Sequence, residues 1–319
     1  MSSPNTNPWL HRLAWLTAVV ALLPISFGAV VTTLDAGMAF PDWLTADGVF
    51  VPLYPWLKAT GDKFVEHGHR LAVIVEGVLL LLMTGVVFSR PSRRDVRLVT
   101  GLIVLGYLGQ AVLGGQRVIR DERVLALLHG DFAACVFAVM GLLVAMTGPR
   151  WTTERMAVEP SRATAAFAWG LVALATLSVQ YVLGGMLRHF GAAHAWLAHP
   201  WFAIAVAASA IAFLVAAIRT GSFELRRTGA WVLGLVVAQA LLGVVTWGVR
   251  YGFPQWDIVA VQQSSLQVAI RSLHKVLGLV TFMAVFVSVV RTARAAGVGE
   301  KVFGTLGSVP DTGFAGGPA

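Results

Sequence analysis

Charged residues are scarce in this chain: Asp, Glu, Lys and Arg make up 13% of its 319 residues, against 57% hydrophobic residues. Soluble domains carry about 25% charged residues, so the composition excludes an ordinary soluble protein. The single cysteine, Cys135, excludes an intramolecular disulfide, and because it lies in an apolar run we expect a buried, inert thiol. The net charge of +8 is dispersed in short clusters between apolar runs, which argues against a nucleic-acid partner and for topology signals.

Long apolar stretches dominate what is present, and eight of them reach the roughly 20 residues needed to cross a bilayer. They cover about residues 13–34, 68–89, 98–117, 125–147, 164–186, 197–218, 229–249 and 270–290. The sequence therefore predicts an all-α integral membrane protein embedded in a lipid bilayer. Basic clusters at 90–97, 150–162, 219–227 and 291–301 share a side with both termini. The positive-inside rule predicts that this side is cytoplasmic and that the protein is a multi-pass protein of the cell membrane.

A glycine motif recurs along the chain. It reads Gln110-Ala-Val-Leu-Gly-Gly115, Gln180-Tyr-Val-Leu-Gly-Gly185 and Gln239-Ala-Leu-Leu-Gly243. The recurrence predicts two four-helix bundles related by repetition, residues 1–150 and 160–295, in the same orientation. We interpret the glycines first as small residues that permit close helix packing. The aromatic- and proline-rich segment 35–63 should form an ordered outer cap, and the glycine-rich tail 296–319 should be disordered.

Four histidines begin the even-numbered apolar stretches, all at the outer face. They are His69, His129, His199 and His274. An imidazole at a membrane boundary is costly without a partner, and facing histidines in a four-helix bundle are typical haem-iron ligands. Pairing within each half predicts two haem sites toward the outer face. Zinc is a weaker alternative because the ligands do not cluster at short spacing, and four core histidines with internal partners are the remaining one.

A carboxylate accompanies only the first histidine pair. Glu66 lies three residues before His69 and shares its helical face, whereas Trp196 occupies the aligned place before His199. A carboxylate near bound iron can take or deliver protons, which predicts a catalytic role for Glu66. A negative charge favoured at a helix start is the alternative interpretation.

Basic residues adjoin the histidines at the outer boundary. Arg70 follows His69, and Arg271 and Lys275 flank His274. These cations could pair with haem propionates or serve as snorkelling interfacial anchors. Few ionisable residues lie at mid-membrane, Glu76 being the main exception, which makes a transporter the weaker hypothesis.

These residues resemble a known family, the haem A synthases, over roughly residues 13–293. The resemblance rests on Glu-x-x-His-Arg at 66–70, the single His opening the fourth stretch, the Gln-x-x-Leu-Gly-Gly motif and the Ala-Gly-Met-Ala-Phe-Pro-Asp-Trp segment at 36–43. It implies oxidation of the C8 methyl group of haem O to a formyl group by successive hydroxylations. It further implies that His69 and His129 bracket the substrate haem O, that Glu66 is required, and that His199 and His274 hold haem b.

The family resemblance also implies work beside cytochrome oxidase assembly, with a haem O synthase and assembly factors as partners. Two departures from the family pattern stand out: the cysteine pair that some members carry in the first outer loop is missing, and Pro200 follows His199 where Arg70 follows His69. His194 is therefore the fallback ligand. A dihaem electron-transfer protein of cytochrome b type and a haem carrier in oxidase assembly are the alternative functions.

Overall fold

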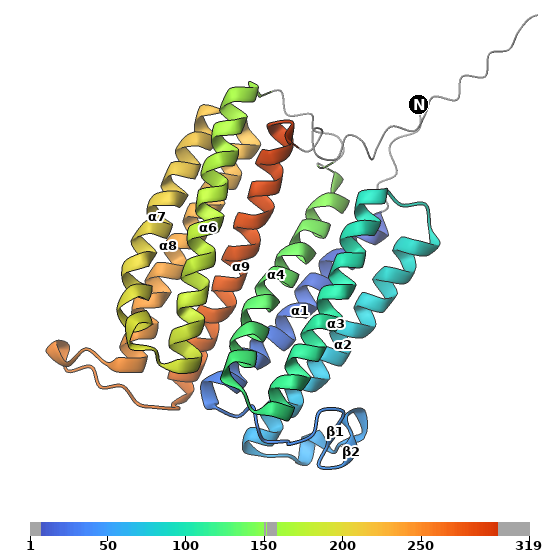
Figure 1. Cartoon of the computed structure of the whole chain (residues 1–319), viewed down its shortest axis with the longest axis vertical. Coiled ribbons are helices and arrows are strands. Elements are labelled where there is room, and N and C mark those ends of the chain that lie inside the picture. The colour runs from blue at the N-terminus through green and yellow to red at the C-terminus, as the bar shows by residue number, and fades with distance from the viewer. Residues whose placement is uncertain (1–7, 150, 152–157, 299–319) are drawn as a thin grey trace, which may run out of the picture.

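The computed structural model describes residues 8–149, 151 and 158–298, and eight long helices make up most of it (Figure 1). They are α1 (Pro8–Leu34), α2 (Gly61–Ser89), α3 (Arg94–Arg120), α4 (Arg123–Thr147), α6 (Pro160–Phe190), α7 (Ala193–Arg219), α8 (Phe223–Tyr251) and α9 (Ser265–Ala295). Each contains one of the predicted apolar stretches and is long and apolar enough to cross a membrane. The prediction of an all-α multi-pass membrane protein is confirmed. The predicted disorder of the tail concerns mainly residues 299–319, which lie outside the described residues.

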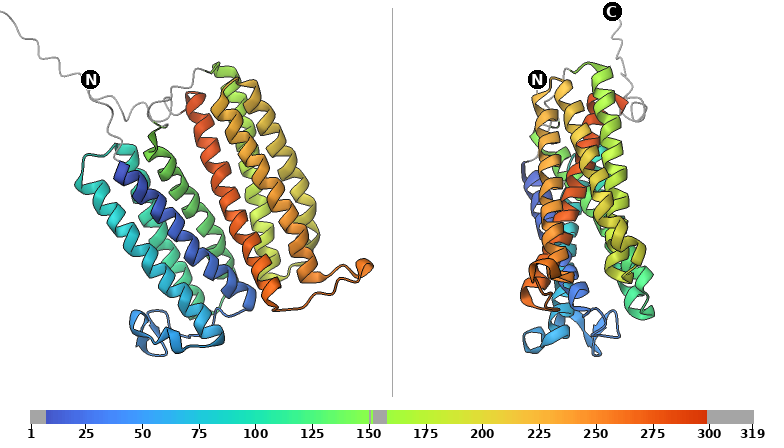
Figure 2. Two further views of the ribbon diagram at one scale, coloured as in Figure 1. Left: turned by 180° about the vertical axis from the view of Figure 1, so that it is seen from behind. Right: turned by 90° about the vertical axis from the view of Figure 1, so that its left-hand side faces the viewer.

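Local sequence signals set the ends of these helices. Ser222 and Ser264 cap α8 and α9, and each hydroxyl oxygen accepts a hydrogen bond of 3.3 Å from a first-turn N–H. Asp121 (φ 50°) and Gly191 (φ 59°) end α3 and α6 in the left-handed conformation that Gly and Asp tolerate best. The chain therefore reverses sharply, and α2, α4, α7 and α9 all begin at the same end of the molecule (Figures 1 and 2).

Two four-helix bundles lie side by side, α1–α4 and α6–α9 (Figures 1 and 2). Each bundle closes on itself because its first helix also contacts its last. The helix α9 packs in addition against α1 and α4, where Gly141 of α4 leaves room for Met283 of α9. The arrangement suits two repeated halves, but their common origin and the boundaries 1–150 and 160–295 stay a prediction.

Large apolar side chains cover the outward surfaces of the helices, as a bilayer requires. Leu81 is 71% exposed and Leu241 64% exposed within the chain itself. Cys135 also lies on an exposed side of α4, so the expectation of a buried thiol is wrong. A helix that is apolar all round does not reveal from its sequence which face packs inward.

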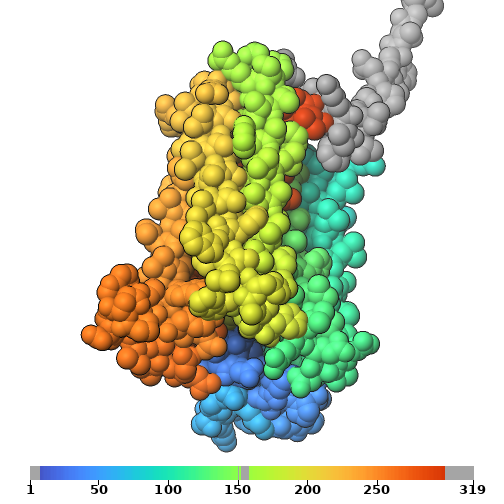
Figure 3. Space-filling model, turned by 60° about the vertical axis from the view of Figure 1, so that its left-hand side comes forward, coloured from blue at the N-terminus to red at the C-terminus, as the bar shows by residue number. Residues whose placement is uncertain are grey.

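The segment between α1 and α2 is an ordered cap beneath the first bundle, as expected. It consists of the antiparallel strands β1 (Thr45–Ala46) and β2 (Val49–Phe50) followed by the 3₁₀ turns η1 (Val51–Leu53) and η2 (Trp56–Lys58). Asp47 (φ 52°) and Gly48 (φ 78°) form the two-residue turn between the strands. The loop between α8 and α9, which contains η3 (Pro254–Trp256), projects at the same end beneath the second bundle (Figure 3).

Candidate cofactor and active site

Each bundle lines a cavity near the end that carries these loops. The first cavity, of about 470 Å³, is lined by His69 of α2 and His129 of α4. The second, of about 680 Å³, is lined by His199 of α7 and His274 of α9. Both volumes fall within the range of about 300–1,000 Å³ found for small-molecule and cofactor sites. The histidines that the sequence pairs therefore share a cavity in each bundle.

The two rings of the second histidine pair are close, and one is edge-on to the other. The ring centroids of His199 and His274 are 6.4 Å apart, with the ring planes at 83°. That separation is long enough for a metal between the rings, since it covers the distance from each ring centre to its nitrogen atom and a metal–nitrogen bond of about 2 Å on each side. The Nδ1 atoms of both rings are buried without a hydrogen-bond partner among the described residues. The geometry fits a metal held on a line between the two imidazoles.

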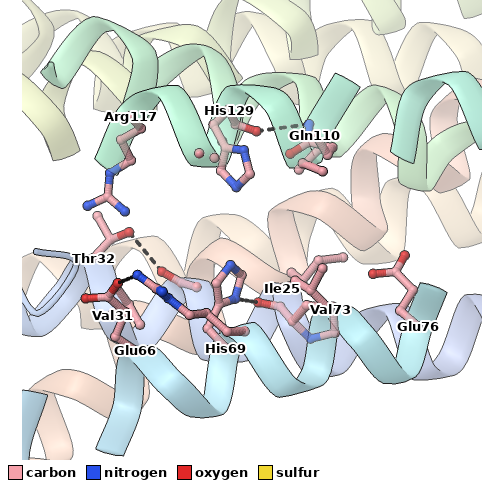
Figure 4. Close-up of a pocket in the computed structure, with 18 of the residues that line it drawn as sticks. Ile25, Val31, Thr32, Glu66, His69, Val73, Glu76, Gln110, Arg117 and His129 are labelled. Atoms are coloured by element: carbon pink, nitrogen blue, oxygen red, sulfur yellow. Dashed lines mark hydrogen bonds and ion pairs between the residues drawn. The ribbon is translucent and has the colours of Figure 1, made fainter. Parts of the chain in front are cut away.

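The first histidine pair faces across its cavity from opposite walls (Figure 4). The carbonyl oxygen of Pro24 on α1 accepts a hydrogen bond of 2.9 Å from Nδ1 of His69. Because a carbonyl cannot donate, Nδ1 carries the proton and Nε2 keeps its lone pair for a ligand in the cavity. His69 is therefore held in the tautomer that can bind iron.

A glycine on the preceding helix lies beside every one of the four imidazoles. Measured from the place where a Cβ atom would stand, the ring Cε1 atoms are only 3.0–3.3 Å away. The glycines are Gly28, Gly114, Gly184 and Gly243. The glycines therefore do permit close packing, and the specific contact is with the histidine rings.

A glutamine one turn before three of these glycines fixes the backbone of the facing histidine. Its Nε2 donates to the histidine carbonyl oxygen at 3.2 Å, 2.9 Å and 3.0 Å. The pairs are Gln110 with His129, Gln180 with His199 and Gln239 with His274. On α1 the same place is taken by Pro24, which is why the sequence motif did not reveal the fourth member.

Glu66 lies in the wall of the first cavity, and both of its carboxylate oxygens are engaged. Oε2 accepts hydrogen bonds from the backbone N–H groups of Ala39 at 2.7 Å and Phe40 at 3.3 Å. Oε1 forms an ion pair with Arg70 at 2.7 Å. The side chain is only 4% exposed. In this structure the carboxylate therefore fastens the loop between α1 and α2 to α2 at the edge of the cavity.

Arg70 also lines the first cavity but contributes most of its donors to the same loop. Its guanidinium donates to the carbonyl oxygens of Asp42 at 2.8 Å and Thr45 at 2.7 Å. Burial opposes ionisation of the Asp42 carboxyl, yet hydrogen bonds from the Thr45 hydroxyl and the Gly48 N–H, together with the Arg70 charge, lower its pKa below the ordinary value. A propionate contact for Arg70 stays a prediction.

Other cations reach the cavities, and sequence reasoning missed three of them, Arg117, Arg188 and Arg250. Arg271 lines the second cavity only, whereas Lys275 lines both cavities, its Nζ 4.1 Å from the Tyr181 ring centroid. Arg188 of α6 also lines both cavities and donates to the carbonyl oxygen of Ala29 on α1 at 2.6 Å. Arg117 of α3 points into the first cavity (Figure 4). Their position in the last turns of α3, α6 and α8, at the end of the molecule where the histidine-bearing helices begin, was the available signal.

The structure separates the two candidate histidines at the start of α7. His199 lines the second cavity, whereas His194 is exposed and lines neither cavity. Trp196, which aligns with Glu66, packs at a tilt against Trp247 with ring centroids 4.9 Å apart, and it does not line the second cavity. The second cavity thus has no carboxylate at the position that Glu66 occupies in the first.

The described residues offer no group of three His, Cys, Asp or Glu side chains that could hold a bare metal ion. Two histidines per cavity suffice when a macrocycle supplies the other four ligands of iron, and they do not suffice for a structural zinc site. The donor set therefore fits haem better than zinc.

Comparison with known proteins agrees with this chemistry. A family model described as cytochrome oxidase assembly protein matches residues 1–141. The chain is 30% identical over 269 residues to the haem A synthase of Symbiobacterium thermophilum, covering 74% of this chain and 85% of that protein. The haem A synthases of Rhizobium rhizogenes and Mesorhizobium japonicum are 30% and 33% identical over 150 and 144 residues, about two fifths of each chain.

Proposed function

This chain belongs to the haem A synthase family, and we propose that it is the membrane oxidoreductase that converts haem O to haem A. The reaction oxidises the C8 methyl group of haem O to a formyl group by successive hydroxylations. The observation that best supports this assignment is an asymmetry between two similar cavities. Both contain facing histidines, but only the first has a buried carboxylate, Glu66, in its wall.

We place the substrate in the first cavity. His69 and His129 would hold its iron from both sides, with the free Nε2 of His69 supported by the hydrogen bond to Pro24. Arg117, Arg188 and Lys275 lie in the cavity wall and would pair with the two propionates. Trp43 and Leu44 of the loop fastened by Glu66 also line the cavity, so the loop would cover part of the bound substrate.

Glu66 is the residue we assign to proton transfer. Its carboxylate lies in the cavity wall, and its ion pair with Arg70 holds it at a fixed place. A carboxylate there could take up or deliver protons as the methyl group is oxidised. The two loop N–H groups that it accepts from would keep its orientation constant during successive turnovers.

We assign haem b to the second cavity, held by His199 and His274. When bound, haem b supplies reversible one-electron transfer. Arg271 and Lys275 are the cations of this chain that would pair with its propionates. Arg188 and Lys275 line both cavities, so the cationic ends of the two sites adjoin.

Two haem sites that adjoin at Arg188 and Lys275 would also suit a dihaem electron-transfer protein, which is the second candidate function. It predicts two redox-active haems and no change in either of them. In both cases the protein would work in the cell membrane with its termini in the cytoplasm and its haem sites toward the outer face, as the arginine distribution favours. A haem O synthase and oxidase assembly factors are the partners we propose.

Haem analysis tests the proposed function directly. The protein should be expressed with a source of haem O, and the extracted haems separated and identified by mass. We expect hydroxylated and formyl haem from the wild type and from Asp62→Asn, which removes an exposed carboxylate one turn before Glu66. Glu66→Gln should yield neither product while the bis-histidine optical spectrum persists. A haem-loaded wild type that forms no oxidised haem would contradict the assignment and favour electron transfer alone.

A further inference from the structure

Glu76 is an unpaired carboxylate deep in the first bundle. It lies on α2 seven residues beyond His69, about 10 Å farther from the loop end at 1.5 Å per residue, and it lines the same cavity (Figure 4). No hydrogen bond or ion pair joins it to another described residue. An ionisable group at this depth is costly unless it has a partner. Because the side chain points into the cavity, we expect a ligand of that cavity to be its partner.

The residues equivalent to Glu76 after the other three histidines differ from it in chemistry. The positions seven residues beyond the four histidines all line a cavity, and they are Glu76, Val136, Val206 and Thr281. Thr281 donates its hydroxyl to the carbonyl oxygen of Leu277 at 2.8 Å and is thus engaged within its own helix. Only the first cavity has a free polar group at this depth.

Tyr107 of α3 adds a second polar group to the same end of the cavity. Its hydroxyl donates to the carbonyl oxygen of Val73 at 2.8 Å, one turn before Glu76. Gly77 allows this approach, since a Cβ atom there would collide with the tyrosine oxygen. The corresponding cavity-lining residues on α1, α6 and α8 are Ala21, Leu177 and Val236. All three are apolar, so the deep end of the second cavity offers no equivalent.

The first cavity therefore has two polar ends with the histidine pair between them. Arg117 points into the loop end and Glu76 into the deep end (Figure 4). Propionates match the cations, so the opposite edge of the ligand must offer a donor to a carboxylate. Haem b has only methyl and vinyl groups away from its propionates. Haem O has a hydroxyl on the first carbon of its isoprenoid substituent.

We propose that Glu76, with Tyr107 beside it, binds the substituent hydroxyl of haem O and gives the first cavity its preference for haem O over haem b. The proposal rests on the proposed function. The hydroxyl is unchanged by oxidation at C8, so the same contact retains the partly oxidised substrate between hydroxylations. With propionates and hydroxyl both held, the macrocycle cannot turn about the axis through His69 and His129. One methyl group is then presented for reaction.

Equilibrium binding tests the subsite without turnover. The full-length protein in detergent, with haem b already in its second site, is titrated with ferric haem O and with ferric haem b, and binding is followed in the Soret band. Glu76→Leu should weaken haem O binding about tenfold or more, since it removes a buried hydrogen bond to a charged acceptor, and should leave haem b binding unchanged or tighter. Glu76→Gln keeps an acceptor and should fall between wild type and Glu76→Leu.

Thr281→Val is the matched control, because it removes a hydroxyl at the same register of the second cavity. It should keep the wild-type ratio of the two dissociation constants for the first site. Equal affinity of the wild type for both haems, or an equal loss of both in Glu76→Leu, would overturn the proposal. If Glu76→Leu does not fold, Glu76→Gln and Tyr107→Phe give the same comparison, and an unchanged ratio in both overturns it.

The outcome is separable from that of the proposed function. A protein that prefers haem O in a Glu76-dependent way but forms no formyl haem would support the subsite and contradict the oxidation. A protein that forms formyl haem with the same affinity ratio in wild type and Glu76→Leu would contradict the subsite alone.

Discussion

Removing the Glu66 carboxylate should release the outer loop from the first bundle. The side chain is 4% exposed and accepts hydrogen bonds from Ala39 N–H, Phe40 N–H and the Arg70 guanidinium. Glu66→Ala would leave two backbone donors and a buried cation without an acceptor. A hydrogen bond to a charged group contributes about 1.5–3 kcal/mol, and breaking a buried ion pair by removing one partner costs about 3–5 kcal/mol.

These contributions share one carboxylate and are not additive, so we take about 3–5 kcal/mol as the total for local opening of the loop. Every 1.4 kcal/mol is a factor of ten, and the amides of Ala39 and Phe40 should therefore exchange with solvent at least about a hundredfold faster. Hydrogen–deuterium exchange with mass spectrometry on the peptide spanning residues 35–45, in detergent, measures this directly.

Asp47→Ala is the matched control, because it removes an ion pair of the same loop that is exposed. The pair joins Asp47 to Lys63 at 2.6 Å, with both side chains more than 40% exposed. Exposed pairs contribute about 0–1 kcal/mol, so exchange should change by less than about fivefold. Unchanged protection of Ala39 and Phe40 in Glu66→Ala would refute the reasoning and assign the loop's attachment to other contacts, such as Trp43 packed on Gly115.

Two further predictions concern the second cavity. His199→Ala should abolish the bis-histidine optical spectrum of that site, whereas His194→Ala should leave it intact because His194 is exposed. Reduced-minus-oxidised spectra distinguish the two variants. The reverse result would make His194 the ligand in place of His199. Gly184→Ala places a methyl group 3.0 Å from Cε1 of His199 and should lower the haem content of the site, while Gly234→Ala, with open space around it, should not; equal haem-to-protein ratios would count against the contact.

The eight helices could be predicted from sequence because apolar length is itself what makes a segment cross a bilayer. The location of the four histidines at one end of the molecule followed from counting the helices, since every second membrane-spanning helix must begin on the same side. Chain reversals at Asp121 and Gly191 are local and readable. These features depend on few long-range contacts, and periodicity and composition encode them directly.

The contacts of the site could not be predicted in the same way. Arg188 reaches the carbonyl oxygen of Ala29, 159 residues away, and joins two bundles that the sequence treats separately. The role of Glu66 in holding the loop depends on the backbone of Ala39 and Phe40, which no side-chain pattern reveals. The same limit applies to Cys135, whose exposure depends on how α4 is rotated against its neighbours.

Both cavities are built from the same arrangement of helices, glycines and histidines. A difference in chemistry between the two cavities must therefore come from the lining positions at which their residues differ. Those positions lie on α2 and α3: Glu66 lines the first cavity whereas the aligned Trp196 does not line the second, and Glu76 and Tyr107 stand where the second cavity has Val206 and Val236. Neither change disturbs the imidazoles, because the glycine contacts recur in every helix pair. The proposed assignments thus separate iron ligation from substrate recognition. On these assignments, grafting Glu76 and Tyr107 onto the second cavity should add affinity for haem O there without adding oxidation, for which we propose that Glu66 is required.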